Sequence, residues 1–528
     1  MQWAKTITDK ICEEKHFDNR FLKCFSERPS GINQLFSDAL VRNPTGEAVV
    51  AGENRLTYTQ LDELVTELAA GLTDRGVGRG DRVGMLIGNR LEFLTVLLAT
   101  IRIGAIAVPI NIREQTPELL YILNHCGAKL LVHELDIDSR VPERNAVEHL
   151  KHRYSIGGST DNARDFSELA NQRAPDSIYK GAEEDVAVIL YTSGTTGLPK
   201  GAMLTHLNIV HSTMHFELCM EMGNFERSML AVPASHVTGL VANICTMLRV
   251  AGCTVMMNVF EAQSFLEIAA HEKITQTLIV PAMYNLFLLR CETDDYDLSA
   301  WRIGAYGGAP MPESTIKALS QKLPQLQLIN AYGSTEATSP ATMLPPGTGA
   351  VRSDSVGIAL PCADIRVVDD QQNDVADGEH GELWIAGPMV VPGYWNDSEK
   401  TRQEFHDGYW KSGDIGSRDE QGFFSLHDRR KDMIIRGGYN IYSAEVENVV
   451  AALEQVVECA VVGRPDPVLG EKTEVIVYAG DSSTSESLIT DHCRAQLADY
   501  KIPDFVTFIT QPLPRNANGK VIKTALRN

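Results

Sequence analysis

The sequence predicts an α/β protein with a large N-terminal domain and a small α+β C-terminal domain. Strands alternate with helices in the first third, short glycine- and aromatic-rich segments precede residue 430, and a self-contained helix–strand–strand–helix pattern follows it. Alternation of this kind produces right-handed βαβ units and a mainly parallel sheet. We therefore expect βαβ subdomains plus a β-rich subdomain over residues 1–430, and a small domain over residues 431–528.

The elements of the first third can be placed by their apolar patterns. A first helix is predicted from a capping-box-like Thr59-x-x-Asp62 to Gly76, because apolar residues recur at helical spacing between them. A short apolar strand and a second helix, from Asn89 to Ile101, should follow. The expected strands of this region are 82–87, 105–110 and 128–132.

The C-terminal pattern begins after a polar joint at 427–432, which is suited to act as a hinge. Before the joint, three segments have the composition of short strands and turns: 381–395, 408–414 and 422–428. After it, a helix is predicted from Ser443, then two strands, then a helix that ends near Tyr500. Roughly a hundred residues is a common size for a small domain.

Length and composition narrow the classes of function that the chain could have. A chain of 528 residues is too long for one ordinary core, and 44% hydrophobic with 22% charged residues is typical of a globular protein. The net charge of -21 argues against wholesale binding to nucleic acid or to an anionic membrane. If the substrates are anions, the cations that bind them must be concentrated locally.

The sequence also predicts a cytoplasmic location. The first thirty residues mix acidic and basic side chains without an apolar run, which is unlike a signal peptide. The most apolar stretch, 93–108, is interrupted by Arg102 and Gly104 and is too short to cross a bilayer, so we expect no transmembrane segment. The ten cysteines are scattered, with no CxxC pair and no Cys/His cluster at zinc spacing, which favours reduced thiols.

The most informative segment is Tyr191–Gly201, YTSGTTGLPKG, which follows an apolar strand at 186–190. Glycines let backbone N–H groups surround an anion, hydroxyls add donors and the lysine adds charge, so the segment suits a polyphosphate. The glycine–lysine spacing differs from a Walker A loop. The glycines at 76, 78 and 80 precede a strand rather than a helix, which indicates a turn and not a dinucleotide site.

TSGTTGLPKG resembles the signature of the adenylate-forming superfamily, which includes acyl-CoA synthetases, luciferases and the adenylation domains of peptide synthetases. The resemblance covers nearly the whole chain and is closest to the acyl-CoA synthetases. Further matching motifs occur in the family's order: AYGGAPM (305–311), NAYGSTEAT (330–338), GELWIAGPMVVPGYW (381–395), WKSGD (410–414), DRRKDMIIRGGYNIYSAEVE (428–447) and PRNANGKVIK (514–523).

This resemblance implies a carboxylic acid–CoA ligase. Such an enzyme joins the acid to ATP as an acyl-adenylate with release of pyrophosphate, and then passes the acyl group to coenzyme A with release of AMP. ATP and coenzyme A are then substrates and Mg²⁺ is the metal. Two other readings stay open: a stand-alone adenylation enzyme that loads a carrier protein, and a non-catalytic adenylate-binding protein. A homodimer is compatible with each of them.

The resemblance assigns nucleotide-binding roles by position. In the family, TSGTTGLPKG binds phosphate and the segment Gly307–Ala309 lies along the adenine. Tyr332 stacks on the base, Thr335 binds phosphate, and Asp414 accepts the ribose hydroxyls. The expected nucleotide-binding residues are Thr192, Ser193, Gly194, Thr195, Thr196, Lys200, Gly307, Gly308, Ala309, Tyr332, Gly333, Thr335, Asp414 and Arg429. Glu336 and Thr192 are the expected Mg²⁺ ligands, since hard oxygen donors suit that ion.

Lys520 is the principal catalytic candidate, accompanied by Thr192, Glu336 and His236. The resemblance aligns Lys520 with a C-terminal lysine that bridges the carboxylate and the α-phosphate, where it stabilises charge that grows in the transition state. We expect Lys523 and Lys501 to be solvated. The family rotates its small, mobile C-terminal domain between the two reactions. Lys431 occupies the hinge position, and Gly437, Gly438 and Tyr439 should line the channel for coenzyme A.

The acid pocket is predicted around segment 233–240. By resemblance, its substrate-binding residues are His236, Thr238, Gly239, Gly307 and Ala331. His236 taken alone is equally compatible with a hydrogen-bonded core histidine. Amino-acid-activating relatives carry an aspartate near this point, whereas Ala234 and Ser235 could not compensate a buried ammonium group. Hydroxycinnamate ligases often have tyrosine where Thr238 stands, so a fatty or simple aromatic acid is favoured.

Overall fold

The structure is a computed structural model that describes residues 1–17, 19–170, 178–192, 198–349, 351–437, 439–453, 455–479, 484–516 and 519–527. The chain divides into two compact units. The first unit comprises Met1–Ile365 and Ile385–Trp410, and the second comprises Arg366–Trp384 and Lys411–Asn528. The predicted domain boundary between residues 430 and 431 stays a prediction.

The first sheet of unit 1 is mainly parallel, and the predicted βαβ pattern builds it. Its strands, in spatial order, are β11 (Lys200–Thr205), β10 (Val186–Thr192), β6 (Ile106–Pro109), β5 (Arg82–Leu86), β7 (Ala128–Glu134), β8 (His152–Ile156) and β9 (Arg164–Asp165). Only the β10–β11 pair among these is antiparallel. The antiparallel pair therefore carries the two ends of the glycine-rich segment.

A second sheet in unit 1 has a parallel centre and antiparallel edges. Its strands, in order, are β18 (Gly357–Ala359), β17 (Thr342–Met343), β16 (Gln327–Tyr332), β15 (Ile303–Tyr306), β14 (Gln276–Ile279), β12 (Arg227–Leu230), β13 (Cys253–Met256), β3 (Glu47–Ala51) and β4 (Asn54–Thr57). The strands from β16 to β3 in this order are parallel. Carboxyl ends of parallel strands meet at one edge, where ligands of α/β proteins bind.

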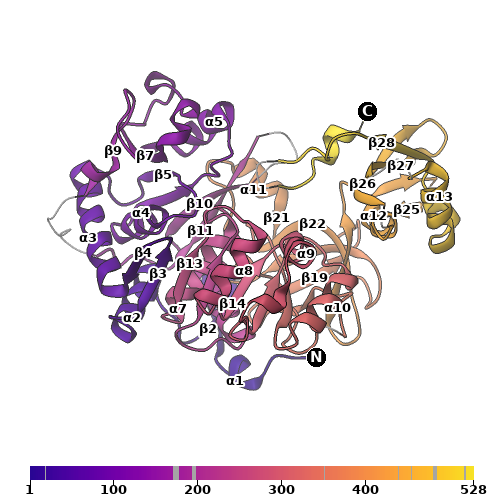
Figure 1. Cartoon of the computed structure of the whole chain (residues 1–528), viewed down its shortest axis with the longest axis horizontal. Coiled ribbons are helices and arrows are strands. Elements are labelled where there is room, and N and C mark those ends of the chain that lie inside the picture. The colour runs from indigo at the N-terminus through magenta and orange to yellow at the C-terminus, as the bar shows by residue number, and fades with distance from the viewer. Residues whose placement is uncertain are drawn as a thin grey trace. The chain divides into compact units, whose positions relative to one another are not determined.

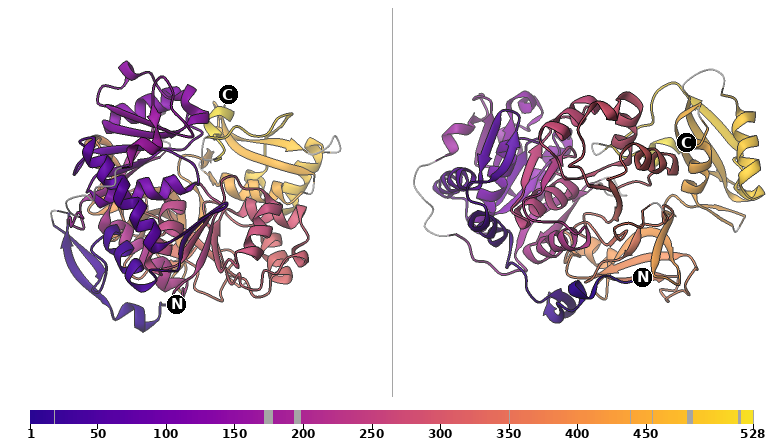
Figure 2. Two further views of the ribbon diagram at one scale, coloured as in Figure 1. Left: turned by 60° about the vertical axis from the view of Figure 1, so that its left-hand side comes forward. Right: turned by 60° about the horizontal axis from the view of Figure 1, so that its bottom comes forward.

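Helices cover the faces of these sheets, as Figures 1 and 2 show. The main ones are α2 (Ile32–Arg42), α3 (Tyr58–Asp74), α4 (Leu91–Arg102), α5 (Thr116–Cys126), α6 (His206–Cys219), α8 (Ala262–His271), α9 (Pro281–Arg290), α10 (Glu313–Lys322) and α11 (Ser398–Glu404). In α4 nearly every residue is buried, as its apolar sequence requires. None of the helices in the described part of the chain combines the length and apolarity that a membrane span needs.

Two predicted helix starts differ in detail from the structure. The capping box of α3 is formed by Thr57 and Gln60 rather than by Thr59 and Asp62. The helix α4 has no side-chain cap at its start, because the Asn89 side chain is turned inward and bonds to other segments. Both errors arise where several polar residues compete for one helix end.

The second unit contains a separate α+β core of the expected kind. Its central sheet has the order β25 (Tyr439–Ile441), β24 (Ile434–Arg436), β27 (Gly470–Ala479) and β26 (Val456–Asp466), with β28 (Phe505–Ile509) parallel to β27. The helices α12 (Ser443–Ala451) and α13 (Glu486–Gln496) contribute Val446, Val450 and Ile489 to its core. The same unit holds β23 (Phe423–Arg429) and, from Lys411 on, its antiparallel partner β22 (Tyr409–Arg418).

Candidate active site

Thr192 and Lys200 are brought face to face at the end of the β10–β11 pair, where they are register partners. Both side chains are partly buried. The expected phosphate-binding residues Ser193, Gly194, Thr195 and Thr196 lie outside the described residues. The strand before the glycine-rich segment is confirmed, and a second strand follows the segment at once.

A polar network connects this strand pair to Glu336. The ammonium group of Lys200 donates to both carboxylate oxygens of Glu404, each at 2.7 Å, and to the hydroxyl oxygen of Tyr394 at 3.2 Å. The Tyr394 hydroxyl lies 2.6 Å from Glu404 Oε2 and 3.0 Å from Glu336 Oε1. Thr192 Oγ1 is 3.5 Å from the same Glu336 oxygen. Three expected site residues are therefore joined through two that the sequence did not indicate.

Glu336 is a buried carboxylate with 7% of its surface exposed. It follows β16, as does Thr335, and Tyr332 is the last residue of that strand; Tyr332 and Thr335 are also buried. Its backbone carbonyl accepts a hydrogen bond from the N–H of Val391 at 2.9 Å, which ties it to the segment that carries Tyr394. A buried carboxylate needs polar or cationic partners, and the network above supplies them.

The segment Gly307–Ala309 follows β15, the parallel neighbour of β16. It therefore lies at the same sheet edge as Ala331–Glu336. A Cβ atom on Gly307 would stand 2.4 Å from the carbonyl oxygen of Ala331, so only glycine fits this close approach. The structure thus places the segment expected along the adenine next to Ala331 and Tyr332, the expected substrate-binding and base-stacking residues.

The expected acid-pocket residues His236, Thr238 and Gly239 form one tight turn into a π-helix, Thr238–Cys245. His236 Nδ1 lies 3.2 Å from the Thr238 hydroxyl, and the ring is partly exposed rather than enclosed in the core. A Cβ atom on Gly239 would stand 2.3 Å from the carbonyl oxygen of Pro233. π-Helical turns are rare in proteins, and those that occur are often found at functional sites.

Asn89 holds this segment in place, which sequence reasoning missed. Its buried amide donates to the carbonyls of Leu230 at 3.3 Å, Val232 at 2.9 Å and Met257 at 3.0 Å. Its oxygen accepts from the Ala234 N–H at 2.7 Å. The sequence offered no signal for this role, because the partners are more than a hundred residues away.

In unit 2, Asp414 and Arg429 are register partners on β22 and β23. Arg429 Nε lies 2.5 Å from Asp414 Oδ1, and the carboxylate side chain is 8% exposed while the arginine is 41% exposed. The structure therefore brings these two expected nucleotide-binding residues together as an ion pair.

The expected hinge residue Lys431 and the expected coenzyme A residues Gly437 and Tyr439 are exposed. The backbone carbonyl of Lys431 accepts a hydrogen bond from Arg527 at 2.9 Å. Gly437 has a φ of 58°, and the Tyr439 ring stacks on Tyr500 with centroids 4.6 Å apart. Gly438 lies outside the described residues.

Lys520 lies in a short turn with an exposed side chain. Its N–H donates to Asn516 Oδ1 at 2.9 Å, and its carbonyl accepts from the Asn516 N–H at 2.9 Å. The side chain of Arg515 donates to the Gly519 carbonyl at 2.8 Å and pairs with Glu458 at 2.8 Å. These bonds fix the backbone that presents the lysine.

The expectation that Lys523 and Lys501 are solvated is wrong. Lys523 is paired with Glu447 at 2.7 Å and donates to the Ser443 hydroxyl at 2.7 Å. Lys501 is paired with Glu445 at 2.6 Å. Burial raises the pKa of the Glu447 carboxyl, although the lysine opposes that rise. Sequence spacing could not show these pairs, because the partners come from α12.

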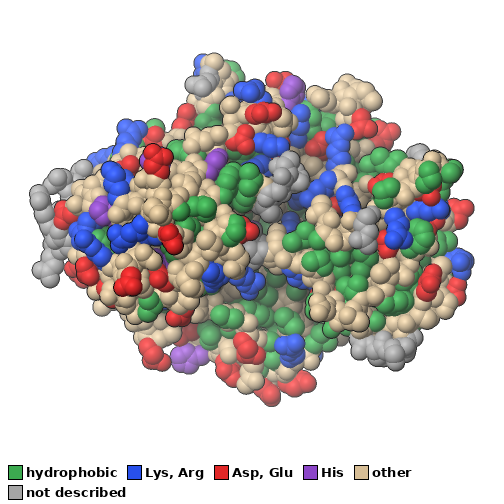
Figure 3. All heavy atoms as spheres, turned by 90° about the horizontal axis from the view of Figure 1, so that it is seen from above, with side chains coloured by type: hydrophobic (Ala, Val, Ile, Leu, Met, Phe, Trp, Pro, Cys, Tyr) green, Lys and Arg blue, Asp and Glu red, His purple; other side chains and the backbone are tan. Residues whose placement is uncertain are grey.

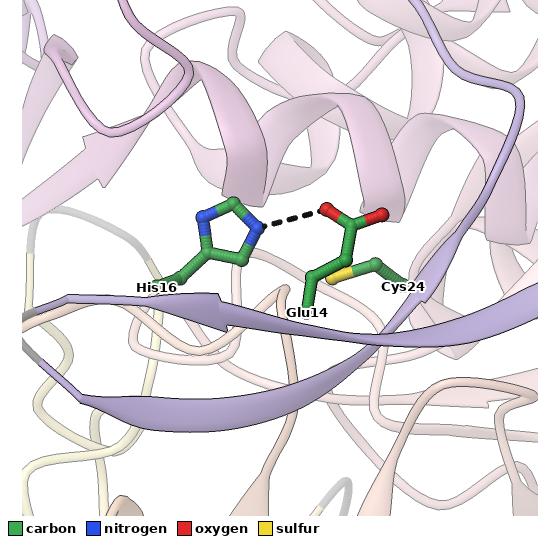
Figure 4. A group of neighbouring side chains, drawn as sticks. All are labelled: Glu14, His16 and Cys24. Atoms are coloured by element: carbon green, nitrogen blue, oxygen red, sulfur yellow. Dashed lines mark hydrogen bonds and ion pairs between the residues drawn. The ribbon is translucent and has the colours of Figure 1, made fainter.

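A second group of ligand-type side chains lies on the hairpin of β1 (Ile11–His16) and β2 (Arg20–Phe25), shown in Figure 4. The ligand atoms of Glu14, His16 and Cys24 lie within 4.8 Å of one another. Arg28 already supplies a cation to this group, with its guanidinium 2.6 Å from Glu14 and 2.7 Å from Glu183. Burial raises the pKa of the Cys24 thiol to about 12, which keeps it protonated. The group therefore is an ion-pair network.

Comparison with known proteins identifies the family. The profile of the AMP-binding enzyme family matches residues 36–395, and that of the AMP-binding enzyme C-terminal domain matches residues 445–520. A long-chain-fatty-acid–CoA ligase of Mycobacterium tuberculosis is 33% identical over 478 residues, which cover 90% of this chain and 93% of that protein. A feruloyl-CoA synthase of an Amycolatopsis species is 34% identical, over 92% of this chain and 96% of its own length.

The fold agrees with the solved structures of this group. The structure of an o-succinylbenzoate coenzyme A synthetase of Bacillus subtilis in complex with ATP and a magnesium ion matches with a TM-score of 0.82 and 28% identity. The match covers 93% of this chain and 98% of that one. The expected α/β fold and the expected superfamily are thus confirmed: this chain belongs to the AMP-binding enzyme family, among the acyl-CoA synthetases.

Proposed function

We propose that this chain is an AMP-forming acid–CoA ligase whose acid is a fatty or simple aromatic carboxylate. The enzyme joins the acid to ATP as an acyl-adenylate with release of pyrophosphate, and transfers the acyl group to coenzyme A with release of AMP. The observation that carries the proposal is the convergence of Thr192, Lys200 and Glu336 on one buried polar network in a chain of this family.

Because the chain has a net charge of -21, the anionic nucleotide must be bound by individual cationic residues at the proposed site. Acidic and basic side chains of the described residues are interspersed on the face shown in Figure 3. Lys200 binds the phosphates, and the ion pair of Asp414 with Arg429 orients the carboxylate that accepts the ribose hydroxyls. Gly307–Ala309 and Tyr332 form the adenine site.

Mg²⁺ fits the donor set near Glu336. The carboxylate of Glu336 and the hydroxyl of Thr192 are hard oxygen ligands that lie 3.5 Å apart. These two residues would hold the ion, which when bound neutralises charge on the phosphates. Lys520 adds a positive charge beside the α-phosphate as the acid's oxygen attacks and the bond to pyrophosphate breaks.

The proposed acid class rests on segment 233–240. Ala234 is buried and Ser235 partly buried, and neither offers a charge to pair with an amino acid's ammonium group. The relatives named above are described as acting on a long-chain fatty acid and on ferulate, so their names do not choose between an aliphatic and an aromatic acid.

Free coenzyme A is the proposed thiol acceptor, and a carrier protein is the alternative. The named relatives are coenzyme A ligases, which supports the free thiol. We also propose a cytoplasmic location, supported by ten free cysteines, because a reducing compartment preserves thiols.

The test incubates purified protein with ATP, Mg²⁺ and a panel of fatty and aromatic acids, with and without coenzyme A, and identifies products by mass spectrometry. We expect pyrophosphate and an acyl-adenylate from each productive acid without coenzyme A, and pyrophosphate, AMP and an acyl-CoA where coenzyme A is present. Release of ADP and phosphate would contradict the proposal. Acyl-adenylate that is transferred only to an added carrier protein would replace free coenzyme A by the alternative acceptor.

A further inference from the structure

The Tyr394 hydroxyl occupies an unusual position, between two carboxylates. The residue is 2% exposed, and its oxygen lies 2.6 Å from Glu404 Oε2 and 3.0 Å from Glu336 Oε1. The tyrosine hydroxyl has one proton to donate, and both carboxylates are within its reach. One phenolic proton can satisfy only one of the two carboxylates at a time.

Lys200 is paired with Glu404, so this carboxylate already has a cationic partner. Its ammonium group has three N–H donors, and three acceptors are within reach: both oxygens of Glu404 and the Tyr394 hydroxyl oxygen. With its side chain 12% exposed, the lysine is held by these partners. A phosphate oxygen that takes a hydrogen bond from Lys200 must displace one of them.

The hydrogen bond from Tyr394 stabilises the protein most when it goes to the carboxylate that lacks a cationic partner, because an unpaired buried charge is costly. While Lys200 neutralises Glu404, the Tyr394 hydroxyl stays within hydrogen-bond reach of both carboxylates, 2.6 Å from Glu404 and 3.0 Å from Glu336, and its proton stabilises Glu336 more because that carboxylate has no lysine partner. When Lys200 turns to a phosphate, Glu404 loses its cation and becomes the better acceptor. Glu336 Oε1 is then released from the hydroxyl and is open to a metal ion.

We propose that Tyr394 is a positioning residue that couples phosphate binding at Lys200 to metal binding at Glu336, with Glu404 as the competing partner of the lysine. The inference rests on the proposed function, which gives Lys200 and Glu336 those roles. No bond other than hydrogen bonds changes. The phenolic proton stays on Tyr394 and only turns from one carboxylate to the other.

The experiment measures ATP binding by isothermal titration calorimetry on the full chain, once with EDTA and once with Mg²⁺. The ratio of the two dissociation constants measures the coupling. Since Mg²⁺ and ATP associate in solution equally for every variant, differences between variants report on the protein. In Tyr394→Phe the ratio should fall about five-fold, the value of one hydrogen bond, while the ring that lies 4.6 Å from the Lys200 ammonium is kept.

Tyr58→Phe is the matched control. Tyr58 is another fully buried tyrosine, and its hydroxyl donates to the Gly252 carbonyl at 2.7 Å, away from this network. Its substitution should leave the ratio unchanged. Glu404→Gln removes the competitor for the lysine, so this variant should bind ATP several-fold more tightly in EDTA.

The possible results distinguish a failure of the proposed coupling from a failure of the proposed function. A wild-type chain that binds no ATP overturns both. If the wild type binds ATP but Tyr394→Phe keeps the wild-type ratio, the coupling through Tyr394 is disproved and the proposed function stands. Weaker or unchanged ATP binding by Glu404→Gln in EDTA would show that Glu404 does not compete for Lys200. A loss of coupling in Tyr58→Phe equal to that in Tyr394→Phe would assign the effect to general destabilisation.

Discussion

Glu14 and Arg28 show how a single neighbour changes the chemistry of a residue. The guanidinium of Arg28 holds the pKa of the Glu14 carboxyl at about 2, below its ordinary value of 4.5. Arg55 does the same for Glu272. These carboxylates remain ionised in the folded chain at pH values where they would be protonated in the unfolded chain.

Acid should therefore destabilise the protein in a defined window. A lowered folded-state pKa gives stability that is complete above about pH 4.5 and is lost as pH falls towards 2. Thermal unfolding followed by circular dichroism between pH 7 and pH 3 should show the midpoint falling below about pH 5. Glu14→Gln should have a lower midpoint at pH 7 and lose less on acidification.

Glu13→Gln is the control for that series, because Glu13 is exposed and alternates with Glu14 on the same strand. It should follow the wild type. An acid loss of equal size in Glu14→Gln and the wild type would contradict the role given to the Glu14–Arg28 pair.

Individual site residues could be predicted only where a motif marked them. Thr192, Lys200 and Glu336 were expected from contiguous motifs, and the structure connects them. Glu404 carries no local signal, since its partner Lys200 is 204 residues away. Tyr394 lay inside a recognised motif, but nothing in the motif indicated that its hydroxyl would face two carboxylates.

At the scale of elements, the turn at 233–240 depends on a close contact. A Cβ atom at Gly239 would meet the Pro233 carbonyl, so Gly239→Ala must shift the backbone that precedes the π-helix. We expect a loss of about 1–3 kcal/mol in the free energy of unfolding by urea. The KM for the acid should rise more than the KM for ATP, because the segment belongs to the proposed acid pocket.

Gly78→Ala provides the comparison, since a Cβ atom there would meet nothing within 4 Å. Its effect on unfolding should stay within about 0.5 kcal/mol. Equal rises in the two KM values for Gly239→Ala would argue against a specific role of the turn in acid binding.

Helices and strands with strong apolar periodicity were predictable, as β5, β7 and α4 illustrate. Periodicity records which face of an element is buried, and burial of apolar side chains is what chiefly stabilises these segments. It does not distinguish a π-helix from an α-helix, so the Thr238–Cys245 turn was not foreseen. Nor does it show which polar residue caps a helix, as Thr57 and Asn89 demonstrate.

At the scale of the whole molecule, the proposed function divides one reaction into two half-reactions. Lys520→Ala should lower acyl-adenylate formation by about 10²-fold or more, an order of magnitude typical for one lost electrostatic contact in a transition state. Thioester formation from supplied acyl-adenylate and coenzyme A should be largely spared. Rapid-quench assays of each half-reaction would measure the two rates.

Equal losses in both half-reactions would contradict the separate role of Lys520. Lys523→Ala is an informative companion, because Lys523 is paired with Glu447 and Ser443 inside unit 2. Its loss should lower the thermal midpoint, an effect that Lys520→Ala should not share to the same extent.

The ten cysteines, seven of them buried, make the chain well suited to site-specific labelling. Each has a pKa above the ordinary value, through burial or, at Cys12, chiefly through Glu14, and little thiolate is present at neutral pH. A cysteine engineered on the exposed surface of each unit would react with maleimide dyes first. Energy transfer between such dyes would follow the distance between the units during turnover without removal of a native sulfur.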